Sequence, residues 1–210
     1  AAYLVLLSKY SNQYDIVVGS PIAGRSHSDL ENIIGMFVNA LPMRNRIEAD
    51  KSFLEILASV RENSLKAFEN QDYQFEMLVE KLNVEVKPGR NPLYDVGFVL
   101  QNMKMPEMKV NGMRFIPYRD ESKISKSDLT IIATEEGEVI SLVFEYCTSL
   151  FKKETIERLS KDYLKILRIA TSERDIKIKD IELLDSAEKN KMISEIHNVE
   201  EIFEKLLDED

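Results

Sequence analysis

The chain has 210 residues, 44% of them hydrophobic, so it is long enough to bury one sizeable core. Its net charge of −9 argues against a nucleic-acid partner, since proteins that bind the phosphate backbone concentrate lysine and arginine. One cysteine, Cys147, excludes an intramolecular disulfide, and no apolar stretch reaches the ~18 to 20 residues of a membrane span. We therefore expect a cytoplasmic protein without a membrane partner or a metal site.

The first part of the chain predicts a helix followed by two strands. Residues 1–10 have the apolar pattern of a helix, but no capping residue stands before them. We therefore expect this chain to be part of a longer protein. A β-branched run over residues 15–23 predicts a buried strand, and residues 24–32 a loop. Residues 36–47 alternate as a second strand, which Pro42 restricts to a sheet edge or a bulge.

Two helices are predicted next. Ser52 is a candidate N-cap, and Glu55 three residues later completes the pattern of a capping box. Apolar side chains follow at helical spacing: Phe53, Ile56, Leu57, Val60, Leu65 and Phe68. A second, short helix is predicted over residues 75–82, with Asp72 as its N-cap. The prolines and glycine of residues 87–92 then predict a loop.

The second half is rich in predicted strands. Strand-like segments occupy residues 96–102, 108–118, 129–135 and 139–146, and we interpret them as an antiparallel meander. A long helix is predicted from about 153 to 170, and it places Ile156, Leu159, Tyr163 and Ile166 on one face. This order of elements indicates an α+β fold with helices packed on one side of a sheet.

Three segments carry a family resemblance through their order and spacing. They are GSPIAGR at residues 19–25 with IGMFVNAL at 34–41 and Arg44, NQDYQFE at 70–76, and GRNPL at 89–93 followed by VLQN at 99–102. Together they resemble the last three core motifs of nonribosomal peptide synthetase condensation domains. We predict that residues 1–185 form the C-terminal lobe of such a domain, and that residues 186–210 are an acidic helical linker or tail.

The resemblance implies one lobe of the chloramphenicol acetyltransferase-like fold, with a largely antiparallel or mixed sheet and helices on one side. It also implies a reaction, the formation of an amide between an acyl or peptidyl donor and an aminoacyl acceptor. Both substrates are held on phosphopantetheine arms of peptidyl carrier proteins, so no cofactor is bound directly. The implied partners are those carriers, an N-terminal lobe and an adjacent adenylation domain.

The family's catalytic signature is two adjacent histidines, three residues and then Asp-Gly. This sequence holds two histidines, His27 and His197, and neither stands in that pattern. We therefore assign no catalytic residue and expect the isolated lobe to be inactive. Because it would expose a face that normally packs against another lobe, we also expect it to self-associate.

Five residues are candidates for lining the substrate tunnel. The resemblance places Gly19, Ser20, Gly24 and Arg25 near the tunnel floor; the alternative is a strand that ends in a turn, with Arg25 in a surface ion pair. Asn39 stands among apolar neighbours, so its amide either ties two backbone segments together or faces the tunnel. Cys147 is expected to fill the core.

Two other functions remain open. The first is a non-catalytic module that binds carrier proteins or other lobes. The second is a coenzyme A-dependent acyltransferase of the same superfamily, which would share the fold but take its acyl group from a soluble thioester.

Overall fold

The computed structural model describes residues 1–101, 108–110, 112–115 and 124–184. Their helices are α1 (Ala2–Ser11), α2 (Phe53–Glu69), α3 (Phe75–Leu82) and α4 (Lys153–Ser172), with short 3-10 turns at Ser28–Leu30 and Ile178–Asp180. Their strands are β1 (Asp15–Ile22), β2 (Asn39–Arg46), β3 (Val96–Gln101), β4 (Met108–Val110), β5 (Met113–Phe115), β6 (Leu129–Glu136) and β7 (Val139–Tyr146). The acidic helix predicted over residues 186–210 lies outside the described residues.

Five strands form one mixed sheet in the order β2-β1-β3-β6-β7. The two outer pairs, β1–β2 and β6–β7, are antiparallel, whereas β3 runs parallel to both β1 and β6. The antiparallel meander is therefore wrong for β3 and β6. The segment predicted as one strand over residues 108–118 instead holds β4 and β5, which form a separate antiparallel pair around Gly112 at φ 81°.

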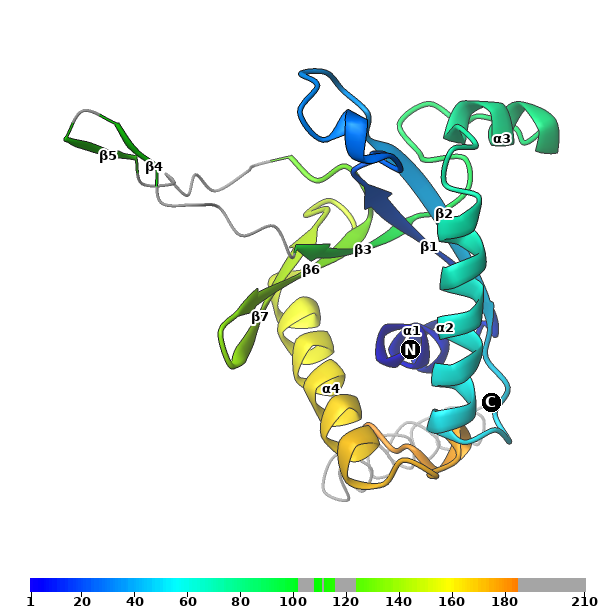
Figure 1. Cartoon of the computed structure of the whole chain (residues 1–210). Coiled ribbons are helices and arrows are strands. Elements are labelled where there is room, and N and C mark those ends of the chain that lie inside the picture. The colour runs from blue at the N-terminus through cyan, green and yellow to red at the C-terminus, as the bar shows by residue number, and fades with distance from the viewer. Residues whose placement is uncertain (102–107, 111, 116–123, 185–210) are drawn as a thin grey trace, which may run out of the picture.

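Helices α1, α2 and α4 cover one face of this sheet, and α1 lies between the other two (Figure 1). Val5 and Leu6 of α1 are completely buried, as expected for a helix that is enclosed by others. Its neighbour α4 buries the apolar face predicted from the sequence, including Tyr163 and Ile166. The core sits between these helices and the inward side chains of the sheet, such as Ile131 of β6.

The sheet-facing helix α2 begins as predicted. Ser52 is its N-cap, and the backbone N–H of Glu55 donates to the Ser52 hydroxyl at 3.3 Å while the Glu55 carboxylate accepts from the Ser52 N–H at 2.8 Å. The short helix α3 has the predicted bounds, but its N-cap is Gln74, so the assignment of Asp72 is wrong. Asn39 accounts for the start of α3, because its side-chain oxygen accepts from the N–H of Phe75.

Strand β2 lies at one edge of the sheet, as Pro42 requires. Its outward-facing Arg44 makes two hydrogen bonds to Asp15 on β1, at 2.9 and 2.7 Å. Strand β7 forms the other edge. Within the residues described, no helix is long and apolar enough to cross a membrane.

Candidate substrate-binding site

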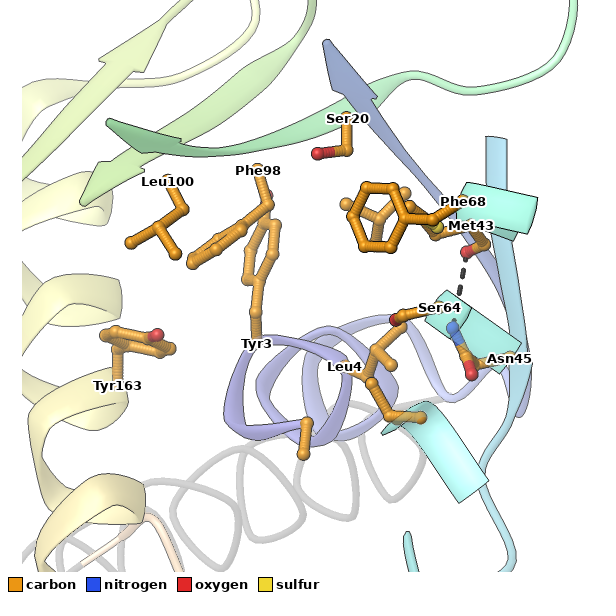
Figure 2. A pocket seen from close by; sticks show the side chains of 13 residues that line it. Tyr3, Leu4, Ser20, Met43, Asn45, Ser64, Phe68, Phe98, Leu100 and Tyr163 are labelled. Atoms are coloured by element: carbon orange, nitrogen blue, oxygen red, sulfur yellow. Dashed lines mark hydrogen bonds between the residues drawn. The ribbon is translucent and has the colours of Figure 1, made fainter. Parts of the chain in front are cut away.

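A cavity of about 290 Å³ lies between the sheet and helices α1, α2 and α4 (Figure 2). The sheet contributes Val18 and Ser20 of β1, Met43 and Asn45 of β2, and Phe98 and Leu100 of β3, while the helices and the residue before α1 contribute Ala1, Tyr3, Leu4, Val60, Ser64, Phe68 and Tyr163. These side chains come from six separate elements. The cavity is therefore a product of the tertiary fold and not of any one motif.

The depth of the cavity follows from the exposure of its lining. Leu4, Val18 and Asn45 are all buried, so they form its floor. Phe68 and Leu100, in contrast, are 42% and 57% exposed, and they mark the side on which the cavity opens. Ser20, near the end of β1, extends from the sheet toward the space between Phe68 and Phe98 (Figure 2). The opening thus lies beside the motif at residues 19–25.

Besides two tyrosines, three neutral polar side chains interrupt the apolar lining. Asn45 accepts a hydrogen bond from Asn63 at 2.9 Å and donates to the Met43 carbonyl at 3.4 Å. The hydroxyls of Ser20 and Ser64 have no hydrogen-bond partner among the described residues. No side chain in the lining carries a formal charge, and burial lowers the pKa of the amino group of Ala1, another lining residue, to about 6. The cavity therefore offers apolar contact and a few neutral polar groups.

The two tyrosines of the lining, Tyr3 and Tyr163, are both buried. Burial raises the pKa of the Tyr3 hydroxyl well above its usual value, and the nearby Tyr163 adds to the effect. Burial alone raises the pKa of Tyr163. Both hydroxyls therefore stay neutral near pH 7, and neither is a candidate general base.

Gly19 points away from this cavity, toward the opposite face of the sheet. A Cβ atom at this position would collide with the ring of Tyr94. The space beside Gly19 is thus occupied by a side chain of the protein itself. Gly97, its neighbour on β3, is similarly crowded, because a Cβ there would lie 2.9 Å from the Thr130 hydroxyl.

Gly24 and Arg25 lie in the loop after β1. The Arg25 guanidinium donates to the carbonyl oxygens of Leu30 and Gly35, and it lies 4.5 Å above the centre of the Phe37 ring. Gly24 adopts φ 64°, and a Cβ there would collide with the Phe37 carbonyl. Both residues therefore bind residues 30–37 into a compact loop. Among the described residues, Arg25 takes part in no ion pair such as the one considered as an alternative.

Asn39 uses its whole amide group for the backbone. Its nitrogen donates to the carbonyls of Gln71 and Tyr73, each at 2.9 Å, and its oxygen accepts from the N–H groups of Ala40 at 2.9 Å and Phe75 at 3.2 Å. All four hydrogen bonds that an amide can make are present. Asn39 therefore ties the start of β2 to the connection between α2 and α3.

A second hollow, of about 380 Å³, lies between β2, the end of α2 and α3. It is lined by Ala40, Leu41, Pro42, Ala67, Asn70, Tyr73, Phe75, Leu78 and Lys81. Of the five candidate residues, the structure thus places Ser20 at the first cavity and Asn39 near the second. Gly19 lies on the outer face of β1, and Gly24 and Arg25 stabilise a loop.

Most of the cavity lining was not identified as functional from the sequence. Tyr3, Phe98 and Tyr163 look like ordinary core residues, because periodicity indicates which face is buried but not where space remains. The only sequence feature that could have indicated the cavity is the small size of Ser20 and Ser64. Each stands on an inward face among larger apolar side chains, where a small residue leaves volume empty.

The remaining reactive side chains lie elsewhere. His27 is exposed and its Nδ1 accepts from the Asp29 N–H at 3.3 Å, while His197 lies outside the described residues. Cys147 is half-buried and outside the core, so the expectation that it fills the core is wrong. A hydrogen bond with Ser149 lowers the pKa of its thiol. In the described ranges, no three metal-binding side chains cluster.

Comparison with known proteins gives one consistent result. The profile of the family described as "Condensation domain" matches residues 1–193. Bacitracin synthase 3 of Bacillus licheniformis is 46% identical over 193 residues, which are 92% of this chain and 3% of that synthase. Gramicidin S synthase 2 of Brevibacillus brevis is 44% identical over 200 residues, covering 94% of this chain and 4% of that synthase. The chain thus spans only a few per cent of the length of these relatives.

Solved structures share the fold over most of the chain. The X-domain in its complex with OxyB from teicoplanin biosynthesis superimposes with a TM-score of 0.78 at 25% identity, over 88% of this chain and 41% of the other. A four-domain nonribosomal peptide synthetase bound to AMP and glycine gives 0.77 at 23% identity, over 88% of this chain and 15% of the other.

Proposed function

The chain belongs to the condensation-domain family, and on this premise we propose that residues 1–185 are the C-terminal lobe of a domain that forms amide bonds in nonribosomal peptide synthesis. The observation that carries the proposal is the match of that family over residues 1–193. The cavity beside Ser20 supports a substrate-binding role for this lobe.

In the proposed reaction, the amine nitrogen of a tethered acceptor attacks the carbonyl carbon of a tethered donor thioester. A C–N bond forms and the C–S bond breaks. The sulfur leaves on the donor carrier's phosphopantetheine arm and takes up the proton that the amine gives up. The proposed partners of this chain are therefore two peptidyl carrier proteins and an adenylation domain.

This lobe contributes binding and position rather than proton transfer. The cavity lining holds no carboxylate, histidine or lysine, and the exposed His27 lies in the loop after β1. We assign the catalytic base to the two-histidine motif of an N-terminal lobe, so the chain by itself is proposed to be inactive. Residues 186–210 are proposed to link the lobe to the next domain.

The test is reconstitution of amide synthesis. The chain is joined to an N-terminal lobe that carries the two-histidine motif, and it is supplied with one carrier loaded with an acyl donor and one loaded with an aminoacyl acceptor. Mass spectrometry should detect the amide on the acceptor carrier. The 210-residue chain alone, with the same loaded carriers, should give none.

One observation favours a second candidate, a binding module without chemistry. The X-domain that superimposes on this chain was solved in a complex with another protein, OxyB. If the joined protein binds loaded carriers but forms no amide, the binding module replaces the proposal. If it instead turns over a free coenzyme A thioester, the soluble-thioester acyltransferase does.

A further inference from the structure

We propose that the cavity beside Ser20 receives a neutral apolar side chain, namely the aliphatic part of an acyl or aminoacyl group carried by a tethered substrate. This inference rests on the proposed function and specifies which substrates the lobe accepts. It follows from the position, lining and size of the cavity.

The position connects the cavity to the predicted substrate path. Ser20 belongs to the motif at residues 19–25, and among the five candidate residues it is the one that lines this cavity. The cavity opens between the exposed side chains of Phe68 and Leu100. A substrate whose polar end lies at Ser20 could therefore extend its apolar end inward, toward Tyr3 and Leu4 (Figure 2).

The lining selects against charge. Nine of the lining side chains are aliphatic or aromatic residues larger than alanine: Tyr3, Leu4, Val18, Met43, Val60, Phe68, Phe98, Leu100 and Tyr163. No acidic or basic side chain is present to compensate a buried charge, and burial lowers the pKa of the Ala1 amino group to about 6, which leaves that group mostly neutral at pH 7. Moving an ion into such surroundings costs several kcal/mol or more, so lysine-like or glutamate-like groups should be excluded.

The size limits what can enter. The cavity holds about 290 Å³. An engineered apolar cavity of ~150 Å³ binds benzene, whereas pockets for whole ligands begin near ~300 Å³. The volume therefore suits an aliphatic chain of about six carbons or one large side chain, with the thioester and its pantetheine arm outside.

The polar groups fit a substrate that is apolar inside and polar at its exit. The Ser20 hydroxyl has no partner among the described residues and can donate to a carbonyl oxygen at the opening. Asn45, at the floor, already forms hydrogen bonds with Asn63 and Met43, so an apolar occupant does not leave its amide without partners.

Direct binding to the 210-residue chain tests the cavity itself. The probes are the N-acetylcysteamine thioesters of hexanoate and of adipate, which have equal chain lengths but differ in a terminal carboxylate. In titration calorimetry, the hexanoyl probe should saturate, and the adipoyl probe should bind at least tenfold more weakly. Equal affinity, or no saturable binding of the hexanoyl probe, would overturn the inference.

Substitutions on α2 locate the bound probe. Ser64→Leu fills the cavity from its α2 wall and should weaken hexanoyl binding at least tenfold. Ala58→Leu adds a similar volume on an exposed part of the same helix and should leave the affinity unchanged. Circular dichroism checks that both variants fold. If Ser64→Leu does not fold, Val60→Ala enlarges the cavity and should shift preference toward an octanoyl probe.

The joined two-lobe protein separates this inference from the proposed function and distinguishes donor from acceptor. With Ser64→Leu, kcat/KM should fall at least tenfold for a hexanoyl or leucyl group on one carrier, but not for an acetyl or glycyl group. If kcat/KM falls for the substrate on the donor carrier, the occupant is the donor's acyl group; if it falls for the substrate on the acceptor carrier, the occupant is the acceptor's side chain. Amide synthesis that is insensitive to Ser64→Leu overturns the inference and leaves the proposed function intact. If the joined protein forms no amide but the hexanoyl probe still binds saturably, the proposed function is overturned and the proposed apolar pocket is supported.

Discussion

The ring of Tyr94 lies over the backbone of Gly19, in the space that any side chain at position 19 would occupy. Tyr94 also packs against Phe75, with ring centroids 5.9 Å apart and planes at 69°. One tyrosine thereby joins the middle of β1, the turn before β3 and the first residue of α3. Gly19 is needed at this position because it leaves room for that ring.

Substitution of Gly19 by alanine should destabilise the fold. The added methyl group overlaps the Tyr94 ring, and overpacking of this kind typically costs ~1 to 3 kcal/mol of unfolding free energy. Urea denaturation measures the loss. Gly35→Ala is the control, since its Cβ would meet the Phe37 ring at 3.2 Å in an exposed loop. Adding Tyr94→Leu to Gly19→Ala should recover part of the lost stability. If Gly19→Ala alone is as stable as the unsubstituted chain, the packing of Tyr94 over Gly19 is contradicted.

Asn39→Ala should loosen the connection between α2 and α3. It removes four hydrogen bonds and leaves two carbonyls and two N–H groups without their partner, at a cost of ~1 to 3 kcal/mol. Hydrogen exchange should rise over residues 70–76 and stay unchanged in α4. Asn39→Asp keeps an accepting oxygen but sets a second carboxylate oxygen against the carbonyls of Gln71 and Tyr73, so it should also raise the exchange. Unchanged hydrogen exchange in both variants would contradict the role of Asn39 in holding the α2–α3 connection against β2.

Ser52→Ala should destabilise the start of α2 by ~1 kcal/mol, the typical value of an N-cap side chain. The Glu55 carboxylate, which accepts from the N–H of residue 52, remains in place and limits the loss. Chemical denaturation gives the value. Ser59→Ala, further along the same helix, is the matched serine control and should cost less.

The pairing of Asp15 with Arg44 should make stability depend on pH. The Arg44 hydrogen bonds, opposed by desolvation and reinforced by the charges of Arg44 and Arg46, hold the pKa of the Asp15 carboxyl below its usual value. A depressed folded-state pKa stabilises the fold above the ordinary aspartate pKa of ~4, and the gain is lost as the pH falls through the folded value.

Asp15→Asn should therefore lower the melting temperature at pH 7, and the difference from the unsubstituted chain should shrink as the pH is lowered past ~4. Asp72→Asn is the control, because Asp72 is exposed and takes part in none of the ion pairs described. A difference that stays constant with pH would show that the carboxyl's charge does not contribute.

We expect the chain to self-associate through its β7 edge. Val139 and Val143 on that strand are 63% and 56% exposed, whereas the opposite edge, β2, carries Pro42 and Arg44, which discourage pairing. Light scattering should show mass that grows with concentration. Val143→Lys should reduce it, and Leu57→Lys on the exposed side of α2 should not. A monodisperse monomer at high concentration would contradict this expectation.

Local signals in the sequence predicted the elements well. Ser52 and Glu55 fixed the start of α2, and Pro42 correctly restricted β2 to an edge. The partners of β3 could not be predicted in this way, because an alternating apolar strand looks the same whether its neighbours are parallel or antiparallel. The N-cap at Asp72 failed for a related reason, since Asn39, distant in sequence, determines where α3 begins.

The site was harder to predict than the fold. A motif identified Ser20, but Leu100 and Phe68 could be placed beside it only once the sheet and α2 were seen together. For Asn39, the sequence left two roles open, and its four backbone hydrogen bonds account for the tie between segments. The volume left by Ser64 depends on what packs around it, which periodicity does not describe.

The parallel placement of β3 has a consequence for how the chain acquires its structure. The β1–β2 and β6–β7 pairs join strands that are consecutive in sequence, so each can form soon after its residues meet. Strand β3 must find β1 and β6 across long intervening segments, and contacts of that kind slow folding. Insertion of β3 is thus the expected rate-limiting step, and slow synthesis at low temperature should raise the yield of native protein.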